Sequence, residues 1–201
     1  MRKGREERTS EETEITINLL IEGKGEAQMQ TPIQFLNHML AGFTKHGLFN
    51  IEIHAKGDLE IDQHHTIEDL GIVLGKTFKK ALHDMKGINR AGSFAFPMDE
   101  SLGIVAVDIS GRPHCVFKAK FQRRMCGDLD TDLVEDFFAG FSMGCNCNIA
   151  IYVPYGRNDH HKLEAIFKAF GKSMKMACEI QDRAKNVTPS TKGVIDFVEK
   201  Q

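Results

Sequence analysis

The chain has 201 residues, 41% of them hydrophobic, and a formal net charge of −2. This near-neutral charge gives no reason to expect nucleic acid or a membrane as a partner, and no apolar run approaches the ~20 residues of a membrane span. Residues 1–8 lack the apolar segment of a signal peptide, and the five cysteines contain no C-x-x-C pair, so we expect free thiols in a cytoplasmic protein.

The first half of the chain predicts alternating strands and helices. Apolar and polar residues alternate, as in a half-buried strand, over 15–19 and again over 49–55. Thr31 and Pro32 predict a helix start, with Thr31 as the capping residue and Pro32 in the first helical position. In chain order, the predicted elements are a strand at 15–19, a hairpin turn at 23–25, a helix from 31 to 47, a strand at 49–55 and a helix from about 62 to 85.

The second half predicts the same order of elements. They are a strand near 103–109, a turn at 110–113, a strand through 116, a helix after 131, a strand at 147–153 and a long helix after 158. We therefore predict an α+β fold with an internal duplication, in which each half is a small β-sheet covered by two helices. The predicted halves are 1–95 and 96–201, which together form one compact globular unit.

Local identities support the duplication. Segment 36–43 corresponds to 134–141, and both end in Ala-Gly-Phe. Likewise, Asn50-Ile51-Glu52-Ile53 corresponds to Asn148-Ile149-Ala150-Ile151. Because the repeat is too long for a solenoid unit, it indicates two similar halves that close around a pseudo-twofold axis.

A His-His-x-x-Glu motif occurs once in each half, as His64-His65-x-x-Glu68 and as His160-His161-x-x-Glu164. On a helix, the glutamate lies one turn beyond the histidines, so it can reach the same region. Adjacent histidines diverge by roughly 100° around the helix axis, which suits two metal ions better than one. A single copy would be unremarkable on a surface helix, but two copies supply enough ligands for a pair of ions.

The donor types predict the metal. Imidazole and carboxylate without thiolate favour Mn, Fe, Co, Ni or Zn, and six or more protein ligands over two ions favour Mn. His38 and Asp136 occupy equivalent positions on the first helix of each half, so both are further candidate ligands. The alternatives are an ordinary helix-face histidine for His38 and a surface aspartate for Asp136.

A second group of polar residues is typical of an anion site. Arg90, Arg112, Lys168 and the loop 189–193 carry positive charge, hydroxyl groups and backbone N–H groups. Arginine and lysine are common phosphate partners, and arginine binds phosphate through two hydrogen bonds. From the chemistry of a single side chain, each of these residues is more often a solvated surface charge than a phosphate ligand.

The chain as a whole resembles the imidazoleglycerol-phosphate dehydratases, enzymes of histidine biosynthesis. The resemblance covers about residues 8–194 in the order of the family. The matching segments are 12–13, 35–40, 45–47, 62–69, 90–92, 97–100, 108–113, 158–165 and 189–193.

The resemblance implies a set of site residues. The ligands of two Mn ions per active site would be His38, His64, His65, Glu68, Asp136, His160, His161 and Glu164. The substrate would be bound by Glu12, His46, Arg90, Arg112, Lys168, Ser190 and Lys192, and proton transfer would fall to Glu12, Glu68 and Glu164. The family also implies a 24-subunit homo-oligomer whose active sites lie between subunits, with Glu12 reaching the site of a neighbour.

The chain departs from the family pattern in three places. Asp136 stands where well-known members have histidine, which bears on metal affinity. Ala150 replaces a histidine that is common in the family, within a region that also contains the unusual Cys145-Asn146-Cys147. Gly42 replaces a polar residue that contacts the substrate in some members.

The implied reaction converts imidazole glycerol phosphate to imidazole acetol phosphate and water. Two ions would stabilise the imidazolate form of the substrate ring as Lewis acids. Two other classes of function remain as alternatives. One is a two-metal hydrolase of phosphate esters, which would release phosphate. The other is a metal-storage or structural shell without catalysis, which would bind no substrate.

Overall fold

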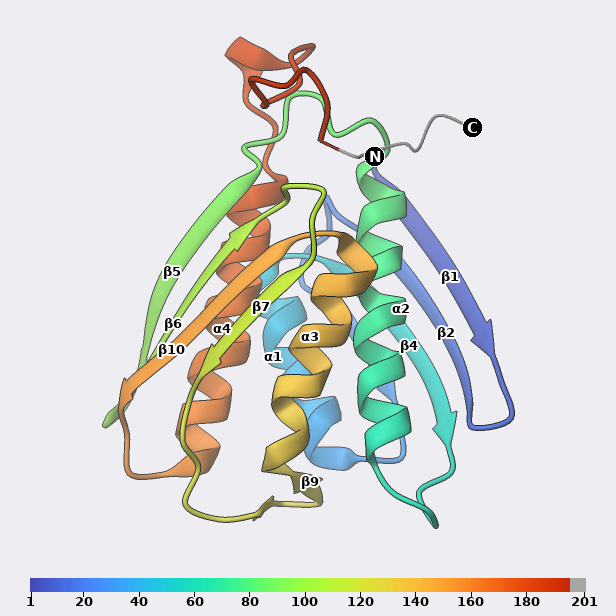
Figure 1. Cartoon of the computed structure of the whole chain (residues 1–201), viewed down its shortest axis with the longest axis vertical. Helices are drawn as coiled ribbons and strands as arrows, with labels where there is room; N and C mark the ends of the chain where they lie inside the picture. The colour runs from blue at the N-terminus through green and yellow to red at the C-terminus, as the bar shows by residue number, and fades with distance from the viewer. Residues whose placement is uncertain (196–201) are drawn as a thin grey trace.

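The computed structural model describes residues 1–195 and consists of two four-stranded sheets with four helices between them (Figure 1). The first sheet has the order β1-β2-β4-β3, formed by β1 (Lys3–Thr9), β2 (Thr13–Leu20), β4 (Asn50–Gly57) and β3 (Ala27–Gln30). The second has the order β5-β6-β10-β7, formed by β5 (Ala91–Met98), β6 (Ser101–Asp108), β10 (Asn148–Tyr155) and β7 (His114–Lys118). The helices are α1 (Gln34–Gly47), α2 (His64–Leu82), α3 (Val134–Cys145) and α4 (Asp159–Cys178).

The two sheets have the same topology, which confirms the predicted α+β fold with two similar halves. In each sheet, one edge strand pairs in parallel, β3 with β4 and β7 with β10, and the other pairs are antiparallel. Helix α2 packs on β1 and β2, and α4 packs on β5 and β6. The division of the chain at residues 95 and 96 stays a prediction.

Two local predictions in the first half are wrong. Residues 23–25 do not form a hairpin turn, because β2 and β3 pair with opposite edges of β4 and not with each other. A glycine-rich turn reverses the chain but does not fix which strands then pair. Helix α1 begins at Gln34, after Ile33, so Pro32 is not in the first helical position and Thr31 does not cap the helix. The Thr31 hydroxyl instead bonds locally to the backbone of Ile33, at 3.2 and 3.3 Å.

Strands β1, β3 and β5 were not predicted from the sequence. Strand β1 is mostly charged, and its one buried residue is Gly4, so no apolar alternation reveals it. A Cβ atom at Gly4 would lie 2.2 Å from the carbonyl oxygen of Thr77 on α2. Backbone pairing with β2 and this close approach to α2 therefore hold β1 in the sheet.

The helices pair across the two halves. Helix α1 packs against α4, and α2 packs against α3. The α2–α3 backbones approach closely at glycines: a Cβ atom at Gly71 would lie 2.2 Å from the oxygen of Phe137, and one at Gly140 would lie 2.6 Å from the oxygen of Glu68. Each half therefore places its first helix against the second helix of the other half.

Three short elements complete the described chain. The connection between β7 and α3 contains the small hairpin of β8 (Met125–Cys126) and β9 (Leu129–Asp130), and then the 3-10 turn η1 (Thr131–Leu133). A second 3-10 turn, η2 (Asp182–Ala184), follows α4. Within residues 1–195, no helix is long and apolar enough to cross a membrane.

Candidate functional site

The pairing of α1 with α4 creates a compact group of metal-binding side chains, here called the His38 cluster: His38, His160 and Glu164. The Nε2 atoms of His38 and His160 lie 3.1 and 2.9 Å from the same oxygen, Oε1 of Glu164. One ligand atom from each residue lies within 4.8 Å of the others. Two imidazole nitrogens and a carboxylate that converge in this way could hold a metal ion.

Positive and hydrogen-bonding neighbours keep Glu164 ionised. Burial alone would raise the pKa of this carboxyl group. Hydrogen bonds from Lys168, His38 and His160 outweigh burial and lower the pKa to about 2. The side chain of Glu164 is 12% exposed and that of His38 is 55% exposed, so a ligand can reach the cluster from the His38 side.

The pairing of α2 with α3 creates the equivalent group, here called the His64 cluster: His64, Glu68 and Asp136. Asp136 lies 3.4 Å from Nδ1 of His64, and Glu68 lies 3.9 Å from its Nε2. The duplication relates Asp136 to His38, and His64 and Glu68 to His160 and Glu164. The structure therefore gathers six of the eight predicted metal ligands into two equivalent groups.

The other two predicted ligands, His65 and His161, point to separate carboxylates. Nδ1 of His65 lies 3.2 and 3.0 Å from the carboxylate oxygens of Asp58, and this hydrogen bond raises the pKa of His65. Nδ1 of His161 lies 2.7 Å from Glu100, whose pKa is lowered to about 2 by hydrogen bonds from His161 and the backbone of Asn158. A carboxylate on Nδ1 fixes the orientation of an imidazole and leaves Nε2 for a metal.

Sequence reasoning missed Asp58 and Glu100 as partners of these histidines. A signal existed for Glu100, because it precedes β6 as Glu12 precedes the equivalent strand β2. Glu12 lies 3.8 Å from Nε2 of His65. Asp99 lies 3.8 Å from Nε2 of His161 and forms a third group of possible metal ligands with Glu100 and His161.

Lys168 and His46 lie near the His38 cluster. The ammonium group of Lys168 pairs with Glu164 and lies 5.6 Å from the centre of the Phe96 ring, and the His46 ring meets the same ring edge-on at 5.0 Å. Burial lowers the pKa of His46, and the charges of Lys168 and Lys172 lower it further. These residues extend the cluster toward the middle of α4.

Arg90 occupies the opposite end of α4. Its guanidinium group bonds to both oxygens of Asp108, at 2.7 and 3.1 Å, and to the carbonyl oxygen of Pro189, at 2.9 Å. Its backbone N–H donates to the carbonyl oxygen of Ala177. At a rise of 1.5 Å per residue, Ala177 lies ~20 Å along α4 from Glu164. Arg90 therefore lies far from the His38 cluster within one chain.

The remaining predicted phosphate-binding residues are held by local hydrogen bonds. The backbone N–H of Lys192 donates to the hydroxyl of Ser190 at 3.2 Å, in the loop that Arg90 contacts through Pro189. Arg112 lies in the turn after β6, where its backbone N–H donates to Ser110 at 3.4 Å. Within residues 1–195, the structure thus brings Arg90 and the 189–193 loop together, and Lys168 of the predicted phosphate-binding group contacts a metal cluster.

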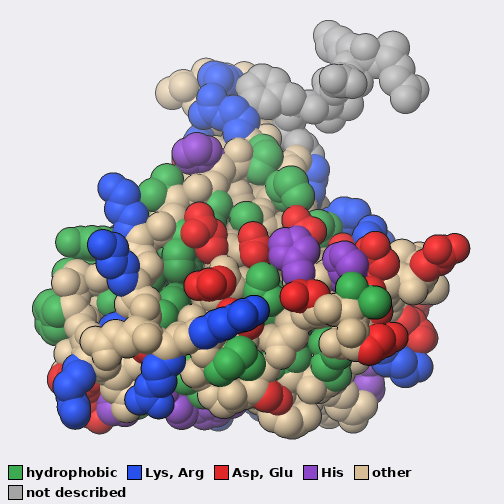
Figure 2. Space-filling view, turned by 60° about the horizontal axis from the view of Figure 1, so that its bottom comes forward, with side chains coloured by type: hydrophobic (Ala, Val, Ile, Leu, Met, Phe, Trp, Pro, Cys, Tyr) green, Lys and Arg blue, Asp and Glu red, His purple; other side chains and the backbone are tan. Residues whose placement is uncertain are grey.

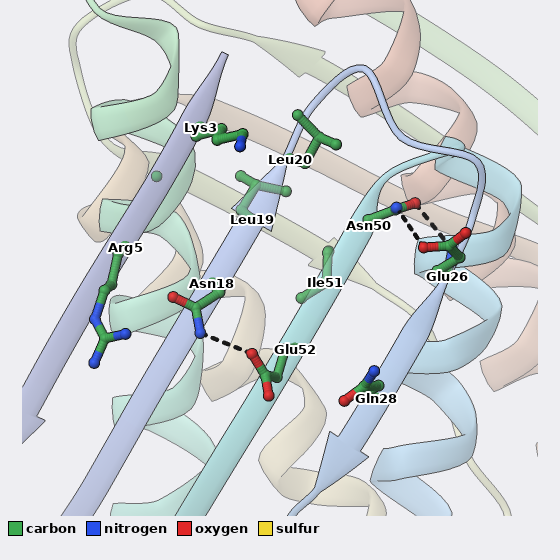
Figure 3. A pocket seen from close by; sticks show the side chains of 11 residues that line it. Lys3, Arg5, Asn18, Leu19, Leu20, Glu26, Gln28, Asn50, Ile51 and Glu52 are labelled. Carbon is green, nitrogen blue, oxygen red and sulfur yellow. Dashed lines mark hydrogen bonds between the residues drawn. The ribbon is translucent and has the colours of Figure 1, made fainter. Parts of the chain in front are cut away.

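Figure 2, in which the lower end of Figure 1 comes forward, shows histidine and acidic side chains gathered next to one another on that face. Figure 3 shows a different pocket of about 510 Å³ on the first sheet, where Asn18 bonds to Glu52 and Asn50 bonds to Glu26. The described residues that line this pocket include no histidine, so it is separate from the clusters.

The fold and the clusters define an α+β protein of two equivalent halves with two equivalent histidine–carboxylate clusters, of which the His38 cluster is compact enough to hold a metal ion. The profile of the imidazoleglycerol-phosphate dehydratase family matches residues 31–174. The chain belongs to this family, whose members are hydro-lyases of histidine biosynthesis.

Similar proteins cover nearly the whole chain. Imidazoleglycerol-phosphate dehydratase of Koribacter versatilis is 49% identical over 195 residues, which span 97% of this chain and 100% of that protein. The Bacillus licheniformis enzyme is 48% identical over 195 residues, which also span 97% of this chain and 100% of that protein. The crystal structure of the Staphylococcus aureus enzyme has a TM-score of 0.80 at 36% identity and covers 89% of this chain and 99% of its own. The crystal structure of the Pyrococcus furiosus enzyme in complex with (S)-C348 also has a TM-score of 0.80, at 30% identity. The match covers 94% of this chain and 99% of that chain.

Proposed function

We propose that this chain removes water from imidazole glycerol phosphate to give imidazole acetol phosphate, using two Mn ions per active site. The observation that carries the proposal is the pair of equivalent clusters, each built from helices of both halves. Their donors are imidazole nitrogens and carboxylate oxygens, which suit Mn. The proposed ligands are His38, His64, His65, Glu68, Asp136, His160, His161 and Glu164.

The residues of the chain would divide the remaining work. Bound Mn would supply Lewis-acid stabilisation of the imidazolate form of the substrate ring. Glu12, Glu68 and Glu164 are the proposed proton carriers. Glu12 has the greatest freedom of the three, since its side chain is 51% exposed, whereas Glu164 is held by His38, His160 and Lys168. The proposed substrate contacts are Glu12, His46, Arg90, Arg112, Lys168, Ser190 and Lys192.

We further propose that the active sites form between copies of the chain, as in a 24-subunit homo-oligomer. Two observations support this. His65 and His161 turn away from the clusters that their neighbours His64 and His160 enter. Arg90 and the 189–193 loop lie beside the C-terminal end of α4, and Ala177 at that end is ~20 Å along the helix from Glu164. A second copy could bring these separated groups together. We also retain a cytoplasmic location as a prediction.

The test is a dehydratase assay on metal-free and Mn-reloaded protein. Chelated protein should be inactive on imidazole glycerol phosphate and should regain activity with Mn, without release of inorganic phosphate. Glu164→Gln should lose metal and activity, whereas His114→Ala, an exposed histidine outside the clusters, should keep both. Phosphate release would instead indicate a hydrolase, and metal binding without substrate binding would indicate a storage protein. Full turnover by verified metal-free protein would contradict the metal-dependent mechanism.

Particle size tests the assembly. If ligands of one ion come from different copies, metal binding stabilises the assembled state by mass action. Light scattering before and after chelation should then show a loss of the large particle and its return with Mn. An unchanged size through both steps would rule out a bridging role for the metal.

A further inference from the structure

We propose that residues 119–133, here called the strap, set the geometry of both metal clusters, with Asp128 and Gln63 as positioning residues. The strap is the connection from β7 to α3 and contains the β8–β9 hairpin. This inference rests on the proposed metal-dependent function, and it concerns residues that are themselves outside both clusters. The strap bonds to the N-terminal ends of α1, α2 and α4 and then continues into α3, so it joins all four helices that carry candidate ligands.

Asp128 caps the N-terminal end of α1, although it lies 94 positions from Gln34 in the sequence. Its two carboxylate oxygens accept the backbone N–H groups of Gln34, at 2.7 Å, and Phe35, at 2.8 Å. These N–H groups begin α1, and the residue before the helix, Ile33, supplies no side-chain cap. Asp128 therefore replaces the local cap predicted at Thr31 and fixes the start of the helix that carries His38 one turn later.

Gln63 joins the strap to α2. Its side-chain amide donates to the carbonyl oxygen of Asp128 at 2.7 Å and accepts the backbone N–H of Asp130 at 3.1 Å. Gln63 immediately precedes His64 and makes no side-chain cap to its own helix. Its two hydrogen bonds thus tie the first turn of α2 to the same part of the strap that caps α1.

The strap bonds to α4 through a buried ion pair of that helix. Asp159, the first residue of α4, accepts the backbone N–H groups of Gln122 and Arg123, at 2.8 and 2.9 Å. Lys162 pairs with Asp159 at 2.9 Å and donates to the carbonyl oxygen of Lys120 at 2.9 Å. Both side chains are almost fully buried, so each needs its partner. This contact fixes the N-terminal end of α4, where His160 is the second residue.

The strap also touches the cluster through packing. Gly127 has a φ of +60°, and a Cβ atom there would lie 3.0 Å from the Phe35 side chain. The Phe35 ring meets the rings of His160 and His38 edge-on, at 5.0 and 6.2 Å between centroids. The strap therefore sets where α1 and α4 begin. Through Gly127 it also supports the Phe35 ring that contacts His38 and His160.

The test compares Mn binding by Asp128→Ala, Asp128→Asn and Asp132→Ala, using EPR titration of Mn with thermal melting in parallel. Loss of a group bonded directly to a metal ligand typically costs ~10–100-fold in affinity. Asp128 acts one step further away, through the start of the helix that carries His38, so Asp128→Ala should weaken Mn binding at the His38 cluster by up to roughly that factor. The amide introduced by Asp128→Asn would keep one acceptor oxygen for the two N–H groups, so this variant should recover part of the affinity. Asp132 is an exposed carboxylate of the same strap, and Asp132→Ala should bind Mn like the wild type.

The outcomes separate the strap from the proposed function. Wild-type protein that binds no Mn would refute the proposed function itself. Wild-type protein that binds Mn, together with an Asp128→Ala variant that melts earlier but binds Mn with unchanged affinity, would overturn the positioning role. If Asp128→Ala does not fold, Gln63→Ala tests the same role, because it removes the two side-chain hydrogen bonds between Gln63 and the strap. Weakened Mn binding by Gln63→Ala supports the positioning role, and Mn binding with wild-type affinity overturns it.

Discussion

His38 and Glu164 are separated by 126 positions in the chain, yet Nε2 of His38 lies 3.1 Å from Oε1 of Glu164. The contact exists because the first helix of one half packs against the second helix of the other. In the equivalent helix pair, Asp136 and Glu68 lie on either side of the His64 ring, 3.4 Å from Nδ1 and 3.9 Å from Nε2. Asp136 is therefore equivalent to His38 in the sequence repeat and lies on the equivalent helix, beside the histidine of its own cluster.

The first prediction concerns Asp136. Carboxylate is a good Mn ligand and neutralises more of the charge of the ion than imidazole does. Asp136→Ala should lower the Mn bound per chain and the dehydratase activity, whereas Asp136→His should keep much of both. Metal analysis by mass spectrometry measures the stoichiometry, and Glu135→Ala, an exposed acid on the same helix, is the control. Two ions held by Asp136→Ala with wild-type affinity would remove Asp136 from the ligand set.

The second prediction concerns phosphate binding by Arg112. Losing a hydrogen bond to a charged group costs ~1.5–3 kcal/mol, and each 1.4 kcal/mol is tenfold, so Arg112→Ala should raise KM by roughly 10–100-fold. Bound Mn should stay the same, because Arg112 lies in the turn after β6 and not in a metal cluster. Steady-state kinetics and metal analysis check the two parts. Arg157→Ala is a surface control, and normal kinetics of Arg112→Ala would exclude a contact with the substrate.

The third prediction concerns pH and His46. Burial lowers the pKa of His46, Lys168 and Lys172 lower it further, and Glu164 opposes them. The unfolded chain, with a histidine pKa of ~6.5, then binds the proton more readily than the folded protein. This contribution to stability is full above pH ~6.5 and is lost as the pH falls through the folded-state pKa.

The measurement for His46 is the melting temperature of metal-free protein at pH 7.5 and 5.5. The loss of stability at the lower pH should be smaller in His46→Gln than in the wild type, because the variant lacks the group that resists protonation. His114→Gln, an exposed histidine on β7, should follow the wild type. An equal loss in His46→Gln and the wild type would contradict the assignment.

The fourth prediction concerns the close approach of α2 and α3. A Cβ atom at Gly71 would lie 2.2 Å from the backbone oxygen of Phe137, which cannot move without shifting α3. Overpacking of this kind costs ~1–3 kcal/mol, so Gly71→Ala should lower the melting temperature by roughly 2–12 °C. At Gly42 the nearest atom is 3.9 Å away, so Gly42→Ala should melt no earlier than the wild type. Equal melting temperatures for the two variants would refute this account of the helix contact.

Much of the fold could be predicted because its signals are local. Alternation of apolar residues predicted β2 and β4, and helical periodicity predicted α1 and α2, since both periods follow from the backbone geometry of the element itself. The internal repeat then predicted β6, β10, α3 and α4. The repeated His-His-x-x-Glu predicted the pairs of histidines and their divergence around the helix. Strand β1 could not be found in this way, because pairing with β2 and the fit of Gly4 against α2 hold it in place.

The sequence by itself determined the duplication and the family and predicted the types of ligand, because these depend only on which residues recur and at what spacing. Only the tertiary structure decided which helices meet, since the α1–α4 and α2–α3 contacts join distant segments at backbone surfaces shaped by glycine. That packing placed His38 beside Glu164 and His160, and Asp136 beside His64. It also paired His65 with Asp58 and His161 with Glu100, and it placed Arg90 beside the C-terminal end of α4. Such contacts depend on three-dimensional packing between remote residues, for which a linear pattern carries no signal.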